Sequence, residues 1–188
     1  MSTCAICELH DILLKQGKRT YADSVTHLDH ALHCATLAER EGSPAWLVTA
    51  ALTHDIGHLI HAPENFYEGR VEDDNHERVG AYWLRARFDA RVADTVAAHV
   101  EAKRYLCSTE PGYMRALSPG CRLSLTLQGG PMCSAEIHQF EQSPLFKDAL
   151  RIRRWEERPL KRPMDPALLE HFLETARLAL LPSQRGWT

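Results

Sequence analysis

The chain has 188 residues, of which 44% are apolar, and this is enough for one hydrophobic core of ordinary size. The net charge is -3, and Lys and Arg are scattered along the chain, which excludes the basic stripe of a typical nucleic-acid-binding protein. We therefore expect a small charged metabolite as the partner, and no nucleic acid.

Charged residues among the first thirty positions exclude the apolar core of a signal peptide, and no apolar run is long enough to span a bilayer. We expect a cytoplasmic protein with no membrane partner, in which the six cysteines are reduced thiols. Cys4 and Cys7 form a lone C-x-x-C motif with no strand before it and no second pair after it. We interpret this motif as part of a frayed N-terminus.

Most of the chain is predicted to be helical, beginning with residues 24–41, whose apolar residues share one side and which end before Gly42. A second helix, residues 45–60, is apolar almost all the way round, and this pattern predicts a central buried position. Residues 61–73 contain proline, asparagine and glycine and predict a loop close to the functional site.

Asp74 and Asn75 can cap a third helix, which begins near His76. A fourth predicted helix, residues 89–106, carries His99 and Lys103 one turn apart, so both side chains point to the same side.

Turn signals between residues 111 and 131, with a short leucine-rich piece at 121–127, predict a loop. Two short helices at 134–141 and 144–157 and an amphipathic helix at 166–180 complete an all-α, single-domain prediction.

The adjacent residues His54 and Asp55 end the apolar second helix, where an unpaired carboxylate would cost several kcal/mol. A buried pair that only joins two helices is one interpretation. A metal site is favoured because His30, His76 and His99 occur on three other predicted helices among apolar neighbours.

Four histidines and one shared carboxylate exceed the ligands of a tetrahedral zinc ion, and no cysteine ligand pattern accompanies them. Two metals bridged by Asp55 fit better, and nitrogen and oxygen ligands suit iron or manganese. The other histidines have no partner that spacing identifies, namely His10, His27, His33, His61, His138 and His171.

Lys103 could hold an anionic substrate such as a phosphoryl or phosphonyl group beside such a site, although a lysine at this place is more often solvated. His58, one turn after His54, could donate to the same anion or to a backbone carbonyl.

These residues resemble the HD-domain superfamily of metal-dependent phosphohydrolases. Over nearly the whole chain they resemble its branch of mixed-valent di-iron oxygenases that cleave carbon–phosphorus bonds, the PhnZ and TmpB type. The segments that carry the resemblance are residues 25–26, 30–32, 51–52, 54–59, His76, 99–106, 117–119, 127–132 and 153–157.

The resemblance implies one HD domain over residues 1–188, with an N-terminal segment (1–20), the metal and substrate site (21–160) and a C-terminal helix (161–188). It implies two iron ions, Fe(II)/Fe(III), with O2 as co-substrate, in a monomer or a small homo-oligomer. The implied iron ligands are His30, His54, Asp55, His76, His99 and Glu156.

Glu156 replaces the aspartate of the family pattern, and Glu157 is a possible substitute for it. A lysine that follows two acids in the family is displaced here to Lys161. The implied substrate-binding residues are Tyr21, Asp23, His58, Lys103, Cys121, Ser124 and Gln128, and Tyr21, Asp55, His58 and Lys103 are the catalytic candidates. Tyr21 and Asp23 stand for a lid tyrosine and glutamate that contact the amine end of the substrate.

The function implied is the O2-dependent cleavage of a 1-hydroxy-(2-amino)alkylphosphonate to inorganic phosphate and a carboxylate such as glycine or an N-methylated glycine. The alternatives are a metal-dependent HD phosphohydrolase that acts on a phosphate ester or nucleotide, and a non-catalytic sensor with a vestigial site.

Overall fold

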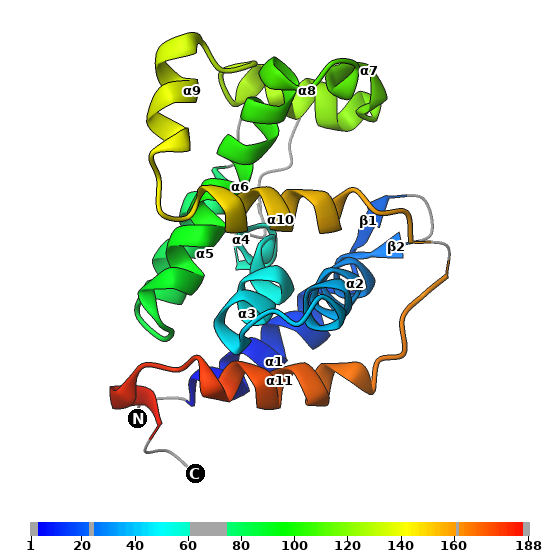
Figure 1. Ribbon diagram of the computed structural model, residues 1–188. Helices are drawn as coiled ribbons and strands as arrows, with labels where there is room; N and C mark the ends of the chain where they lie inside the picture. The colour runs from blue at the N-terminus through cyan, green and yellow to red at the C-terminus, as the bar shows by residue number, and fades with distance from the viewer. Residues whose placement is uncertain (1–3, 23–24, 61–74, 161, 186–188) are drawn as a thin grey trace.

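The computed structural model describes residues 4–22, 25–60, 75–160 and 162–185 as a bundle of α-helices (Figure 1). The all-α prediction is confirmed, with a short antiparallel pair of strands beside the helices. In chain order the elements are α1 (Ala5–Gln16), β1 (Thr20–Ala22), β2 (Val25–Thr26), α2 (His27–Arg40), α3 (Ala45–Thr53), α4 (Ile56–Ile60), α5 (His76–Arg85), α6 (Ala90–Thr109), α7 (Tyr113–Ala116), α8 (Pro119–Leu127), α9 (Ser134–Glu141), α10 (Phe146–Glu156), α11 (Leu168–Leu178) and the 3-10 turn η1 (Pro182–Gln184).

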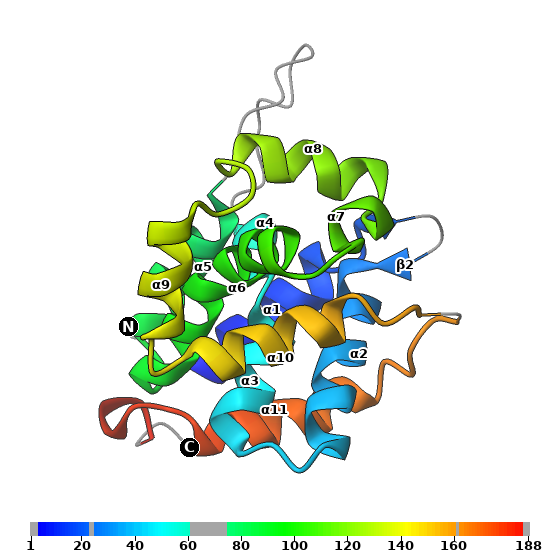
Figure 2. The same cartoon turned by 45° about the horizontal axis from the view of Figure 1, so that its top comes forward.

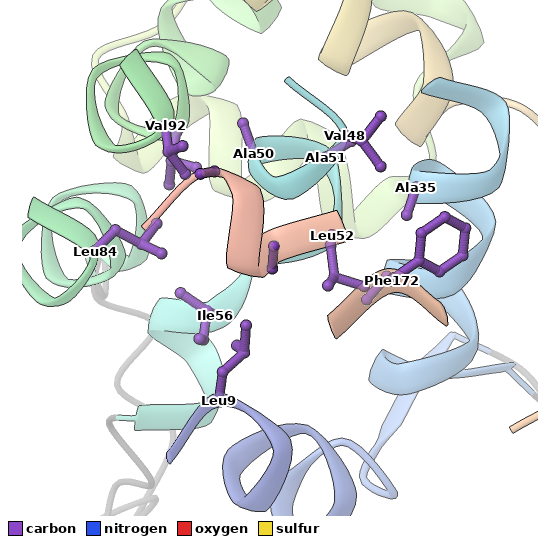
Figure 3. Packing of buried hydrophobic residues seen from close by; sticks show 14 of the residues in the cluster. Leu9, Ala35, Val48, Ala50, Ala51, Leu52, Ile56, Leu84, Val92 and Phe172 are labelled. Atoms are coloured by element: carbon purple, nitrogen blue, oxygen red, sulfur yellow. The ribbon is translucent and has the colours of Figure 1, made fainter. Parts of the chain in front are cut away.

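The α3 helix forms the centre of the core, as its apolar sequence predicted. Every residue from Leu47 to Thr53 is buried, and the helix packs against α2, α6, α10 and α11. The hydroxyls of Thr49 and Thr53 each donate to the carbonyl four residues earlier at 2.7 Å, so burial leaves neither hydroxyl without a partner. Figure 3 shows this packing with Ala35, Val48, Ala50, Ala51, Leu52, Val92 and Phe172.

The predicted continuous helix over residues 45–60 is wrong, because the chain turns at His54 and Asp55 between α3 and α4. After this turn, α4 packs closely against α5. A Cβ atom on Gly57 would lie 1.9 Å from the backbone oxygen of His76, so only glycine allows this contact. In an uninterrupted helix, neighbouring residues point about 100° apart, whereas the turn lets His54 and Asp55 face one centre.

Two segments predicted to be irregular are helices. Residues 5–16 form α1 rather than a frayed N-terminus, because Ile6, Leu9 and Leu13 share one buried side. Residues 119–127 form α8 rather than a loop, because Ser118 accepts a hydrogen bond from the backbone N–H of Cys121 and Pro119 takes the first helical position.

Helices α2 and α6 begin at residues whose side chains accept hydrogen bonds from the backbone N–H groups of the first turn. Thr26 and Asp29 form a capping box at α2, and Asp89 accepts from the backbone N–H of Arg91 at α6. Asn75 takes the N-cap position of α5 with φ 48°, a left-handed conformation that asparagine tolerates. The predicted loop at 61–73 and Asp74 lie outside the described residues.

The short helices α7, α8 and α9 gather at one end of the molecule, whereas α1 and α11 lie at the other (Figures 1 and 2). The long helix α6 joins the two regions, since it packs against α3, α5 and α10 and also against α7 and α9. Along the described ranges, no helix has the length and apolarity needed to cross a bilayer. Helix α6 carries two of the candidate residues, His99 and Lys103.

Candidate metal centre

Four histidines from separate parts of the bundle meet around Asp55. His30 comes from α2, His54 from the turn after α3, His76 from the first residue of α5 and His99 from the middle of α6. All four are at least 93% buried, since their exposed fractions range from 0% to 7%. The predicted convergence of these five side chains is present in the structure.

The histidines form two pairs, and each pair faces a different oxygen of the same carboxylate. The Nε2 atoms of His30 and His54 lie 3.2 Å apart, and they lie 3.8 and 3.5 Å from Asp55 Oδ2. The Nε2 atoms of His76 and His99 also lie 3.2 Å apart, and they lie 3.7 and 3.8 Å from Asp55 Oδ1. Asp55 therefore stands between two donor groups of matching geometry.

Backbone carbonyls orient the histidines. His54 Nδ1 donates to the carbonyl of Ala51 at 2.9 Å, and His99 Nδ1 donates to the carbonyl of Val96 at 2.7 Å. Because a carbonyl can only accept, the proton of each neutral ring is on Nδ1 and the lone pair is on Nε2. These lone pairs face the Asp55 carboxylate, an arrangement that a cation would stabilise and that repels without one.

The protonation states match a metal site. Burial lowers the pKa of His30 to about 4 and that of His99 to about 3, with neighbouring histidines adding to the effect. Burial would raise the pKa of Asp55, but His54, His58 and other nearby histidines lower it well below its usual range. Neutral imidazoles and an ionised carboxylate at neutral pH are the forms that bind metals, so these residues fit the expected ions.

Glu156, at the end of α10, borders the same centre. Its Oε1 accepts a hydrogen bond from Arg153 Nη1 at 2.6 Å, and its buried Oε2 has no hydrogen-bond partner among the described residues. Burial would raise the pKa of Glu156, but Arg153 first, then His54 and His99, lower it to about 2. Glu156 therefore offers one free, ionised oxygen.

Glu157, the possible substitute, has other partners. It accepts hydrogen bonds from the Tyr113 hydroxyl and from Arg153 Nε, and it lines a neighbouring cavity that does not include Asp55. Glu156 lines the cavity that contains Asp55, His76 and His99. The geometry favours Glu156 over Glu157 as the additional ligand.

A cavity of about 260 Å³ opens from the histidine cluster toward α6 and α8. Lys103 is 6% exposed, and its Nζ donates to Ser124 Oγ at 3.0 Å. Ser124 Oγ donates in turn to the carbonyl of Cys121 at 3.1 Å. Burial and the nearby Arg153 lower the pKa of Lys103, and an anion in the cavity would reverse both effects.

Cys121 and Gln128 also line this cavity, so the structure brings these predicted substrate residues together with Lys103 and Ser124. The buried Oε1 of Gln128 has no hydrogen-bond partner in the described part of the chain. These groups give the cavity a polar wall opposite the histidines.

Two aromatic rings each stack on one histidine of the cluster. Tyr21 of β1 stacks on His30 with ring centroids 4.0 Å apart and an interplanar angle of 12°. His58 of α4 stacks on His76 at 3.9 Å and 16°. Both rings line the cavity. Asp23 and Lys161 lie outside the described residues.

Residues 25–125, more than half of the chain, match the HD domain family. This protein belongs to the HD-domain family. Over 155 residues it is 41% identical to a hydroxymethylphosphonate dioxygenase of Gimesia maris, covering 81% of this chain and 76% of the relative. Over 159 residues it is 38% identical to a [1-hydroxy-2-(trimethylamino)ethyl]phosphonate dioxygenase (glycine-betaine-forming) of Leisingera caerulea, covering 84% and 81%. The resemblance to the phosphonate-oxygenase branch of HD-domain proteins is thus confirmed.

Among the described residues, none of the other histidines belongs to the two donor clusters. His171 pairs with Glu39 at 2.7 Å, and His10 lies 3.5 Å from Asp11 and Glu170. His27 packs edge-on against Tyr21. His61 lies outside the described residues.

The sequence patterns missed two residues of the HD-domain site. Cys34 lies one helical turn after His30, and its sulfur is 3.9 Å from His30 Nε2. Arg153 lies three residues before Glu156 and holds its carboxylate. The i, i+4 and i, i+3 spacings from the predicted ligands are the signals that could have identified both residues.

Proposed function

We propose that this HD-domain protein is a di-iron oxygenase that cleaves the carbon–phosphorus bond of a 1-hydroxyalkylphosphonate with O2. The observation that carries the proposal is the position of Asp55 between two histidine pairs, in a chain 41% identical to a phosphonate dioxygenase. The dinuclear arrangement and the choice of iron rest on the donor set of four histidines and carboxylates.

The reaction balances with one molecule of O2. The carbon that bears the hydroxyl loses its bonds to hydrogen and phosphorus and becomes a carboxylate carbon. The carboxylate and the inorganic phosphate each gain one oxygen atom. With a 2-amino-1-hydroxyethyl or an N-methylated substrate, the organic product is glycine or an N-methylated glycine.

The ligands of the proposed ions divide between the two histidine pairs. His30 and His54 would hold one ion, His76 and His99 the other, and Asp55 would bridge them. Glu156, whose Oε2 has no hydrogen-bond partner among the described residues, would be the sixth protein ligand. When bound, the irons supply the Lewis acidity and the redox chemistry with O2.

The α6–α8 wall of the cavity binds the phosphonate in this proposal. Lys103 and Ser124 present an ammonium and a hydroxyl within 3.0 Å of each other, and His58 and Gln128 line the same space. One ion pair at 4 Å is worth about 4 kcal/mol at an effective dielectric near 20, before desolvation. Lys103 thereby fixes the anionic end, which sets the orientation of the reacting carbon.

Tyr21 covers the opposite side, over His30, and acts as the lid that excludes water from the reacting carbon. We further propose one domain over the whole chain, a cytoplasmic location, and a monomer or small homo-oligomer. The small anionic phosphonate is the partner.

Oxygen uptake tests the proposal. Protein loaded anaerobically with Fe(II) receives hydroxymethylphosphonate or 2-amino-1-hydroxyethylphosphonate, and O2 consumption and phosphate release are measured together. The expected result is equal amounts of O2 consumed and phosphate released, with no turnover under argon. The same protein tested with nucleotides under argon provides the comparison.

Phosphate release from a nucleotide or phosphate ester without O2 would instead establish the phosphohydrolase. A protein that binds less than one iron per chain after anaerobic loading would favour the non-catalytic sensor.

A further inference from the structure

Cys34 of α2 lies beside one half of the histidine cluster. It is 0% exposed, and because it follows His30 by four residues, both side chains project from the same side of the helix. Its Sγ lies 3.9 Å from His30 Nε2. The ligand atoms of His30, Cys34 and His54 all lie within 4.8 Å of one another, so the three form a compact group of nitrogen and sulfur donors.

The charges around Cys34 are those of a cation site. Burial first, and then Glu156 and Asp55, raise the pKa of the free Cys34 thiol well above its usual range. The buried Oε2 of Glu156 has no hydrogen-bond partner among the described residues. The Cys34 thiol and the two imidazole nitrogens of this compact group would be stabilised by the same bound cation.

We propose that Cys34 is a direct ligand, as a thiolate, of the ion held by His30 and His54; this inference rests on the proposed dinuclear centre. The sulfur–metal bond forms as the S–H bond breaks, and the proton goes to solvent, with no change in oxidation state. A coordinated thiol is deprotonated outright, so the bound ion overcomes the effect of burial on the free thiol.

The two halves of the centre are then chemically different. The His30 and His54 half has a sulfur donor, whereas the described donor cluster around His76 and His99 has nitrogen and carboxylate oxygen atoms. A soft, anionic sulfur donates more electron density than imidazole and favours different ions from a nitrogen and oxygen set. This difference in donor atoms between the two halves would keep two ions of the same element in distinct electronic environments.

Metal substitution tests this proposal without relying on activity. In protein loaded with two Co(II) per chain, a thiolate ligand produces an intense near-ultraviolet sulfur-to-cobalt charge-transfer band. We expect Cys34→Ser to abolish the band while Cys121→Ser and Cys107→Ser retain it. Cys121 is the matched control because it lines the cavity beside Asp55, His76 and His99 but belongs to neither donor cluster, and Cys107 is a half-buried cysteine. Circular dichroism and metal analysis accompany each variant.

X-ray absorption of the Zn(II)-loaded wild-type protein gives an answer even if Cys34→Ser does not fold. A sulfur scatterer at about 2.3 Å, in addition to nitrogen and oxygen at about 2.0–2.2 Å, is the expected result. Two bound ions with no sulfur scatterer and no charge-transfer band would overturn the role of Cys34 and leave the proposed dinuclear centre intact. A band lost in Cys121→Ser instead would also overturn it, and failure to bind two ions would overturn both proposals.

Discussion

Asp55 directly follows His54 in the chain, and its Oδ2 lies 3.5 Å from the Nε2 of that same histidine. Two neighbouring residues reach one point because α3 ends at Thr53 and the chain turns before α4. The other oxygen of Asp55 remains free to face His76. This turn is what allows one carboxylate to serve both histidine pairs.

Asp55→Asn should therefore affect both proposed ions together. An amide carries no charge and has one good acceptor oxygen, so we expect metal content to fall from two to below one per chain and kcat/KM to fall by more than about 100-fold. Metal analysis after anaerobic loading measures the first effect. The control is Asp94→Asn, in an exposed ion pair with Arg85. Retention of two ions by Asp55→Asn would contradict the bridging role.

Glu156→Gln and Glu157→Gln should separate the two candidate ligands. Glu156→Gln removes the ionised oxygen beside the histidines and should weaken metal binding by at least about 10-fold. Glu157→Gln weakens the contacts to Tyr113 and Arg153 and should lower thermal stability while two ions remain bound. Metal titrations and melting curves of both variants make the comparison. The opposite pattern would assign the ligand to Glu157.

Lys103→Met should weaken substrate binding with little effect on metal content. The loss of an ion pair worth about 4 kcal/mol before desolvation predicts a decrease in kcat/KM of about 100-fold, mostly through KM. Ser124→Ala should have a smaller effect, and the double variant should be less than additive because the two groups are bonded at 3.0 Å. Thr126→Ala is the control, because Thr126 is exposed on α8, the helix that carries Ser124. Full additivity would show that Lys103 and Ser124 act separately.

The metal-free protein should lose stability as the pH falls from about 6.5 toward 4. Histidines of the unfolded chain take up protons near pH 6.5, whereas His30 and His99 in the folded chain do so only near pH 4 and 3. Because the unfolded state binds more protons in this range, the free energy of unfolding decreases with decreasing pH. Urea unfolding of metal-free protein at several pH values measures the slope. A free energy of unfolding that stays constant between about pH 6.5 and 4 would contradict this prediction.

Gly57→Ala should destabilise the protein by about 1–3 kcal/mol. The added Cβ would lie 1.9 Å from the His76 oxygen, so α4 and α5 must move apart and His76 with them. Gly120→Ala is the matched helical control, since its nearest atom is 4.0 Å away, and its effect should stay within about 1 kcal/mol. Urea unfolding gives both values. Equal effects of the two substitutions would show that α4 tolerates a side chain at Gly57.

The sequence by itself determined the helical class and the identity of the central helix. The apolar residues of α3 could only be buried, and the i, i+4 relation of His99 and Lys103 placed both on one side of α6. Buried polar residues in such surroundings need compensation, so His54 and Asp55 already indicated a metal. The same reasoning applied to Ile6, Leu9 and Leu13 would have predicted α1, which the sequence analysis missed.

Only the tertiary structure decided how the donors divide. Gly57 of α4 packs against His76 of α5, a contact between residues of two different helices, and no local pattern encodes it. The different partners of Glu156 and Glu157 are also set by tertiary contacts. Glu157 accepts from Tyr113 and Arg153, whereas Oε2 of Glu156 has no hydrogen-bond partner among the described residues. Helical periodicity gives the side of a helix on which a residue lies, whereas distances between helices are set by packing of the whole core.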